Sequence, residues 1–268
     1  MVPNAHALLS ASSSHRWLNC PPSARLSENY EDKSSDFAAE GTDAHELCEY
    51  KLKKALGQRA KNPTENLTWY NEEMEECASG YAEYVMELIT QAKKNCADPV
   101  VLIEQRLDYS KYVTDGFGTG DCLIIADGTL NIVDYKHGKG VEVSALDNPQ
   151  MKLYALGALE IFDSIYDIEN ITMTIYQPRI ANISTCLIPR GELIDWAEKV
   201  NSAAVTGAGF VRRERNAVKG RMQTSSLPNM ILQNPCSFQM MRLKKSSIKS
   251  TDLFHGQTIL KSMLLRQP

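Results

Sequence analysis

The sequence predicts a mixed α/β domain, of α/β or α+β type, in which helices flank a central mixed sheet. Two observations predict it: long segments with apolar residues at helical spacing, and short β-branched runs separated by glycine-bearing turns. The 268 residues are 43% hydrophobic and 23% charged, a composition typical of a globular protein with one sizeable core. We expect one main domain, residues 1–206, and an atypical basic segment, residues 207–268.

The first elements along the chain are predicted to be helices. The segment Ser10–Tyr30 indicates two short helices, because the prolines after Cys20 interrupt the first of them. A long helix is expected over Ala38–Leu56, where apolar residues recur at helical spacing. The segment Asn71–Cys96 places its apolar residues on one face and predicts an amphipathic helix.

The second half of the domain is predicted to hold the sheet. Asp127-Gly128 is typical of a tight hairpin turn between two strands. The expected strands cover Val100–Leu107, Asp121–Ala126, Leu130–Tyr135, Ile171–Tyr176 and Ser184–Ile188. Helices are expected over Asn148–Phe162 and Glu192–Ala204.

Composition narrows the classes of protein that fit. No apolar run approaches the roughly 18 residues of a membrane-spanning helix, and Met1–Ser14 lacks the features of a secretory signal, so we expect a cytoplasmic protein without a membrane partner. The seven cysteines form neither a CxxC pair nor a zinc-like spacing. We therefore expect buried thiols and no disulfide framework.

Charge is distributed unevenly along the chain. Residues 1–210 carry 18 Lys and Arg against 31 Asp and Glu, whereas residues 211–268 carry 11 against 2. A basic DNA-binding tail is one interpretation. A frameshift is the other, because codon degeneracy allows Met222–Arg242 to encode an acidic, protein-like string in a shifted frame. In that case we expect the segment to be poorly ordered.

A predicted hairpin carries the most informative polar residues. Asp121 begins one strand, and Asp134 and Lys136 end its partner, where alternation places them on one face. Pairing would bring Asp121 near both, so two carboxylates and an ammonium group converge. Such oxygen ligands suit Mg²⁺ or Mn²⁺, which would activate water and neutralise charge on a phosphate. The alternative is two acids beside turns and a solvated lysine at a strand end.

Two further segments occur with this hairpin in a recognisable order. Gly41-Thr42-Asp43-Ala44-His45 has the form G-T-x-x-H, Asp134-Tyr135-Lys136 is D-x-K, and Gln150 to Tyr154 is Q-x-x-x-Y. With Glu104 and the G-x-x-D of Gly118 to Asp121, this order resembles the RecB-like branch of the PD-(D/E)XK nuclease superfamily, including its phage-encoded proteins. The resemblance implies a restriction-endonuclease-like core.

The resemblance also implies roles for individual residues. The metal ligands would be His45, Asp121, Asp134 and the backbone carbonyl of Tyr135, with Lys136, Asp121 and Asp134 as the catalytic residues. Gln150 and Tyr154, one helical turn apart, would contact DNA or brace the ligands; packing of the helix on the sheet is their alternative. Glu104 is either an outer-shell acid or an ordinary strand residue.

Cys20 matches the position at which some relatives have their first iron–sulfur ligand. The other three ligands normally follow the core as a compact cysteine group, but only Cys236 lies beyond Cys186 here. The sequence therefore does not predict a complete cluster, and Cys20 would be a vestigial ligand.

The leading hypothesis is a Mg²⁺- or Mn²⁺-dependent deoxyribonuclease, most simply an exonuclease of phage recombination or DNA processing, with DNA and phage recombination proteins as partners. A non-catalytic DNA-binding protein that keeps the nuclease fold is the alternative. Exonuclease or endonuclease character, strand polarity and strand preference do not follow from these residues.

Overall fold

The computed structural model describes residues 7–27 and 35–200. Its helices are α1 (Ser14–Asn19), α2 (Pro22–Ser27), α3 (Asp36–Ala55), α4 (Glu72–Ala92) and α5 (Pro149–Tyr166), and residues 190–200 are also helical. Side-chain caps fix three of the helix starts: Ser35, Asn71 and Asn148 each accept hydrogen bonds from backbone N–H groups of the first turn. Among the described residues, no helix is long and apolar enough to cross a membrane.

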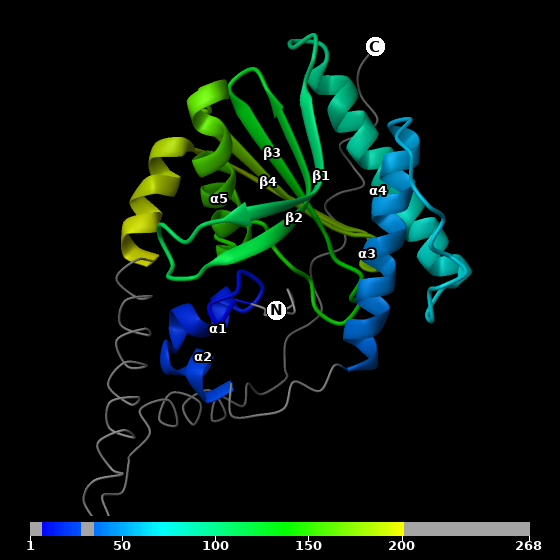
Figure 1. Ribbon diagram of the computed structural model, residues 1–268, viewed down its shortest axis with the longest axis horizontal. Helices are drawn as coiled ribbons and strands as arrows, with labels where there is room; N and C mark the ends of the chain where they lie inside the picture. The colour runs from blue at the N-terminus through cyan, green and yellow to red at the C-terminus, as the bar shows by residue number, and fades with distance from the viewer. Residues whose placement is uncertain (1–6, 28–34, 201–268) are drawn as a thin grey trace, which may run out of the picture. The chain divides into compact units, whose positions relative to one another are not determined.

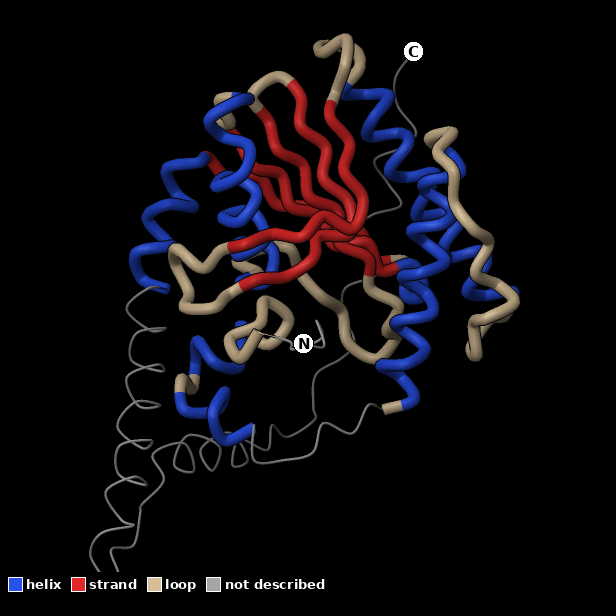
Figure 2. Tube along the Cα trace, viewed as in Figure 1, coloured by secondary structure: helices blue, strands red, loops and turns tan. Residues whose placement is uncertain are grey.

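Five strands form one sheet in chain order (Figures 1 and 2). They are β1 (Val100–Asp108), β2 (Phe117–Ala126), β3 (Thr129–Tyr135), β4 (Asn170–Gln177) and β5 (Asn182–Pro189). The pairs β1–β2, β2–β3 and β4–β5 are antiparallel, whereas β3 and β4 are parallel and are joined through α5. The sheet is therefore mixed, as predicted.

Helices cover both faces of this sheet (Figure 1), and the buried residues form two hydrophobic cores. On one face α3 and α4 pack with Cys122, Ile124 and Val133 of the sheet. On the other, α5 packs with Leu123, Ile132 and neighbouring residues, and Trp17 of α1 joins the same core. Because side chains alternate along a strand, successive residues of β2 enter opposite cores. Helix α3 on one face and helix α5 on the other can thus both approach strands β2 and β3.

The structure confirms the predicted order of elements and shifts several boundaries. Asp127 and Gly128 both have positive φ, 49° and 65°, as a tight hairpin between β2 and β3 requires. Strand β2 begins at Phe117, earlier than predicted, because residues 117–120 extend the ladder with β1. The atypical segment 207–268 lies outside the described residues, so the expectations for it stay predictions.

Candidate metal and catalytic site

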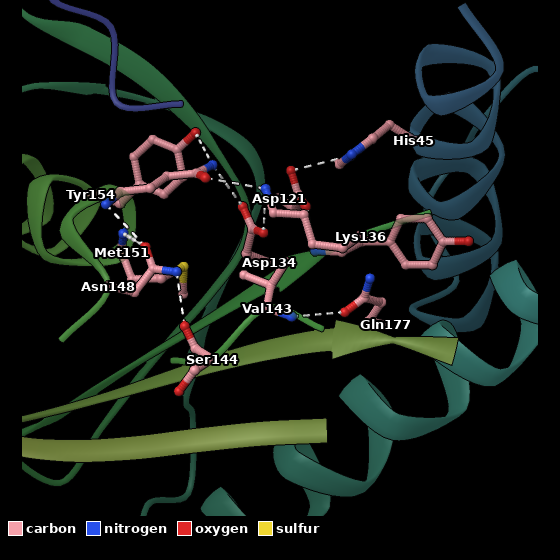
Figure 3. Close-up of polar contacts among 12 residues, drawn as sticks. His45, Asp121, Asp134, Lys136, Val143, Ser144, Asn148, Met151, Tyr154 and Gln177 are labelled. Carbon is pink, nitrogen blue, oxygen red and sulfur yellow. Dashed lines mark hydrogen bonds and ion pairs between the residues drawn. The ribbon is translucent and has the colours of Figure 1, made fainter. Parts of the chain in front are cut away.

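Three side chains from three elements converge beside the point where strand β3 ends. They are His45 of α3, Glu104 of β1 and Asp121 of β2, and one ligand atom of each lies within 4.8 Å of those of the other two. Within residues 7–27 and 35–200, these residues make up the one group of at least three His, Cys, Asp or Glu side chains so arranged. His45 points from α3 toward Asp121, and its Nδ1 lies 3.4 Å from Asp121 Oδ1 (Figure 3).

Strand register places Glu104 opposite Asp121. Ile103 pairs with Cys122 and Gln105 pairs with Gly120, so the two acids face one another in the interrupted part of the ladder. Glu104 has a φ of 50°, which is a left-handed conformation that side-chain-bearing residues rarely adopt in a strand. Such strain typically costs about 1–3 kcal/mol and is found preferentially at functional sites.

The sheet opens between β2 and β3 at this point. Their ladder ends with Cys122 paired to Val133, and the next backbone N–H, of Tyr135, donates to Asp121 Oδ2 at 2.7 Å. The carboxylate of Asp121 thus replaces a backbone acceptor and is held rigidly. Its other oxygen faces His45.

Electrostatics within the group shift its pKa values strongly. Burial lowers the pKa of His45, but the charge and hydrogen bond of Asp121 outweigh burial and raise it to about 9. Burial and the neighbouring charge of Asp121 raise the pKa of Glu104 to about 7. Burial acts to raise the pKa of Asp121, but His45 outweighs it and the pKa is lowered. A proton on His45 therefore balances the crowded carboxylates.

Asp134, at the end of β3, belongs to a second polar group that α5 completes. Lys136 Nζ lies 2.8 Å from Asp134 Oδ2, and Gln150 Nε2 donates to Asp134 Oδ1 at 3.2 Å. The Gln150 amide also accepts from Lys136 Nζ at 3.2 Å and donates to the hydroxyl of Tyr154 at 3.1 Å. The predicted D-x-K and Q-x-x-x-Y segments thus contact one another directly (Figure 3).

The ion pair in this group joins a buried carboxylate to a lysine side chain that is 26% exposed. Burial raises the pKa of Asp134, an effect that Lys136 opposes, and the carboxyl is only 3% exposed. Burial acts to lower the pKa of Lys136, but the charge of Asp134 outweighs it and the pKa is raised. The lysine therefore keeps its proton at neutral pH and offers a fixed positive charge and N–H donors.

Close packing by Tyr154 explains why a glycine, Gly118, lies three residues before Asp121. A Cβ at this position would lie 2.6 Å from Cε1 of the Tyr154 ring. The ring therefore packs directly on the strand backbone, and this contact places its hydroxyl beside Gln150. Gly118 thus serves the close approach of α5 to β2.

The donor set of the first group fits a divalent cation. One imidazole nitrogen and two carboxylates suit Mn²⁺ well, and carboxylate oxygens also suit Mg²⁺. The structure places Glu104 in this group, where the sequence left its role open, whereas Asp134 is engaged by Lys136 and Gln150. Ligation by Asp134 and by the Tyr135 carbonyl stays a prediction.

Comparison with known proteins places the chain in a family. The profile of the family described as "Protein of unknown function (DUF2800)" matches residues 6–224, most of the chain. The chain belongs to the DUF2800 family.

Two solved structures resemble this DUF2800 protein at low identity. A phage-related exonuclease from Haemophilus somnus 129PT is 16% identical, with a TM-score of 0.32 over 79% of this chain and 97% of its own. The protein SSO0001 is 14% identical, with a TM-score of 0.22 over 57% and 83%.

The structure of this DUF2800 protein also shows buried polar residues that the sequence did not single out. His137 follows Lys136 directly, and its Nδ1 lies 2.8 Å from the hydroxyl of Tyr135. Its Nε2 lies 3.4 Å from Glu40, which also pairs with Arg179. The alternation Tyr135-Lys136-His137 at the end of a strand was the one available sign that His137 points inward with Tyr135.

Cys20 lies at the end of helix α1. It is the C-cap residue of α1, is partly buried, and its backbone N–H donates to Arg16. The vestigial ligand role expected for it stays a prediction.

Proposed function

We propose that this DUF2800 protein is a Mg²⁺- or Mn²⁺-dependent deoxyribonuclease, and specifically an exonuclease of phage recombination or DNA processing. One observation carries the proposal. His45, Glu104 and Asp121 gather donor atoms within 4.8 Å, although they come from three separate elements. Asp121 is buried and Glu104 and His45 are partly buried, and the proton on His45 can balance only one of the two crowded carboxyl groups, so the arrangement favours a further cation over a structural role.

The ligands that would hold the metal are His45, Glu104 and Asp121, with Asp134 and the Tyr135 carbonyl completing the shell. When bound, the cation supplies Lewis-acid activation and neutralises charge on a phosphate. Because Tyr135 N–H already occupies Asp121 Oδ2, Asp121 offers Oδ1 to the cation.

Lys136 acts in its charged form. Its raised pKa favours the charged form, so the role that we assign to it is to orient the attacking water and to stabilise the negative charge that develops on the phosphoryl oxygens. Asp134 fixes the ammonium group from one side and Gln150 from the other. The lysine is therefore preorganised before substrate binds.

Gln150 and Tyr154 orient these groups and border the substrate. The Gln150 amide contacts both members of the ion pair, and Tyr154 anchors that amide. We expect α5 to lie beside the scissile phosphate, where the two side chains would contact DNA. We assign the activity to residues 1–206, and phage recombination proteins are the proposed partners.

The test uses the full-length protein with Mn²⁺ and two DNA substrates, one linear and one a covalently closed circle. We expect degradation of the linear DNA alone, and complete loss of activity in EDTA and in Asp121→Asn. Cleavage of both substrates would retain the nuclease and reject the exonuclease. Binding of DNA without cleavage, at metal concentrations that saturate the site, would favour the non-catalytic DNA-binding alternative.

A further inference from the structure

The short connection between β4 and β5 contains an arginine that links helices α3 and α4 to the chain just after strand β3. Arg179 belongs to the 3₁₀ turn Pro178–Ile180, and its side chain is only 7% exposed. Its Nη1 donates to Glu40 of α3 at 2.9 Å and to the backbone carbonyl of His137 at 3.4 Å. Its Nε and Nη2 donate to the two carboxylate oxygens of Glu73 in α4, at 3.1 and 2.8 Å.

These contacts matter because His45 does not belong to the sheet. It is carried by α3, whereas Glu104 and Asp121 are carried by β1 and β2. Glu40 precedes His45 by five residues in the same helix, about 7.5 Å along a rigid axis. Fixing Glu40 to the end of β3 therefore fixes the distance of His45 from the two carboxylates.

A second route runs through aromatic rings. His137 Nε2 lies 3.4 Å from the Glu40 oxygen that Arg179 holds, and its Nδ1 lies 2.8 Å from the hydroxyl of Tyr135. The Tyr135 ring in turn meets the His45 ring edge-on, with centroids 5.5 Å apart. The Tyr135 ring thus contacts the imidazole of His45 directly, in addition to the contact of Arg179 with Glu40 in the same helix.

We infer that Arg179 is a positioning residue for the metal site, which holds His45 of α3 against Glu104 and Asp121 through Glu40 and His137. The inference rests on the proposed metal-dependent function and adds a residue that contacts neither metal nor substrate. Arginine suits this task because its planar fork binds both carboxylate oxygens of Glu73 while Nη1 reaches Glu40, a two-point geometry that lysine cannot reproduce.

The neighbouring Gln177 supplies a matched control. It is as deeply buried, at 2% exposure, and belongs to the same hairpin. Its amide binds the backbone of residues 138–143, through Gly138 O, Val141 O and Val143 N, rather than α3 (Figure 3 shows the contact with Val143). A variant at Gln177 therefore destabilises the same region by a different route.

The experiment is calorimetric titration of full-length protein with Mn²⁺, together with thermal unfolding. Loss of a residue that supports metal ligands typically weakens metal affinity about 10–100-fold. We expect such a loss in Arg179→Gln, a smaller loss in Arg179→Lys, and unchanged affinity in Gln177→Ala despite a lowered Tm. At saturating Mn²⁺, cleavage by Arg179→Gln should recover, because Arg179 touches neither the reacting atoms nor Lys136.

A double-mutant cycle tests the route through α3. Glu40→Gln should weaken Mn²⁺ binding, and the double variant with Arg179→Gln should be little weaker than the single variants. Wild-type affinity in Arg179→Gln and Arg179→Lys would overturn the inference, as would an equal loss in Gln177→Ala at equal Tm. Failure of the wild-type protein to bind Mn²⁺ would instead overturn the proposed function, and this inference with it.

Discussion

Glu104 lies directly opposite Asp121 across the β1–β2 ladder, and both face His45. In the metal-free protein this arrangement is unfavourable, because two crowded carboxyl groups, the buried Asp121 and the partly buried Glu104, compete for one protonated imidazole. The left-handed φ of Glu104 adds backbone strain. The protein therefore gives up stability at this point, which is typical of a binding site.

The first prediction follows from the raised pKa of Glu104, about 7. The pKa of this carboxyl is higher in the folded protein than in the unfolded chain, where it has its ordinary value of 4.5. The folded state is therefore fully stable below that ordinary value and loses stability as the pH rises through about 7, because the carboxyl must then carry a charge in the folded protein. Glu104→Gln removes the penalty, so it should raise the Tm of the metal-free protein at pH 8 and change it little at pH 4.5. With Mn²⁺ present the order should reverse at pH 8. Thermal unfolding at both pH values, with and without metal, is the measurement, and a variant less stable than wild type in EDTA at pH 8 would contradict it.

The second prediction concerns the pH dependence of metal binding. His45 must lose its proton to bind a cation, and its pKa is raised to about 9. Mn²⁺ affinity should therefore rise about tenfold per pH unit between pH 7 and 8.5, and more steeply below pH 7, where Glu104 also competes. His45→Gln should flatten the upper part of this dependence. Calorimetry in buffers of different ionisation enthalpy counts the protons released, and release of none at pH 7.5 would exclude His45 as a ligand.

The third prediction concerns Asp134→Asn. Asparagine keeps an acceptor for Gln150, so folding should be retained, but its neutral amide no longer neutralises Lys136. We expect cleavage to fall at least a hundredfold while Tm changes by only a few degrees. Circular dichroism and a cleavage assay on the same preparation measure both effects. Cleavage at the wild-type rate would place the reaction elsewhere.

The fourth prediction uses two glycines as a matched pair. A Cβ at Gly118 would meet Tyr154 at 2.6 Å, whereas a Cβ at Gly140 would have no atom within 4 Å. Gly118→Ala should cost about 1–3 kcal/mol in the free energy of unfolding and displace Tyr154 from Gln150. Gly140→Ala should leave both stability and cleavage near the wild-type values. Urea unfolding of the two variants decides it; equal stabilities would show that α5 adapts to the added methyl group.

Local patterns were enough to predict the hairpin but not the whole site. Asp127-Gly128 identified the turn because tight hairpins need positive φ at both central residues, and the alternation of Asp134 with Lys136 placed both on one face. Glu104 remained ambiguous, because its backbone strain and its position opposite Asp121 depend on strand register. Arg179 was missed because its contact with Glu40 spans 139 residues of sequence. Such long-range ion pairs leave no periodic trace in one sequence.

The proposed metal-dependent nuclease is tested most directly by the rate of DNA cleavage as a function of Mn²⁺ concentration, for the wild-type protein and for Lys136→Ala. We expect metal-dependent cleavage of linear DNA by the wild type. For the variant we expect a nearly unchanged half-saturating Mn²⁺ concentration and a maximal rate roughly a hundredfold lower, the usual effect of losing one contact that stabilises the transition state. A wild-type protein that leaves DNA intact with its site saturated would contradict the proposed nuclease activity. A variant that reaches the full rate at high metal would contradict the catalytic role of Lys136.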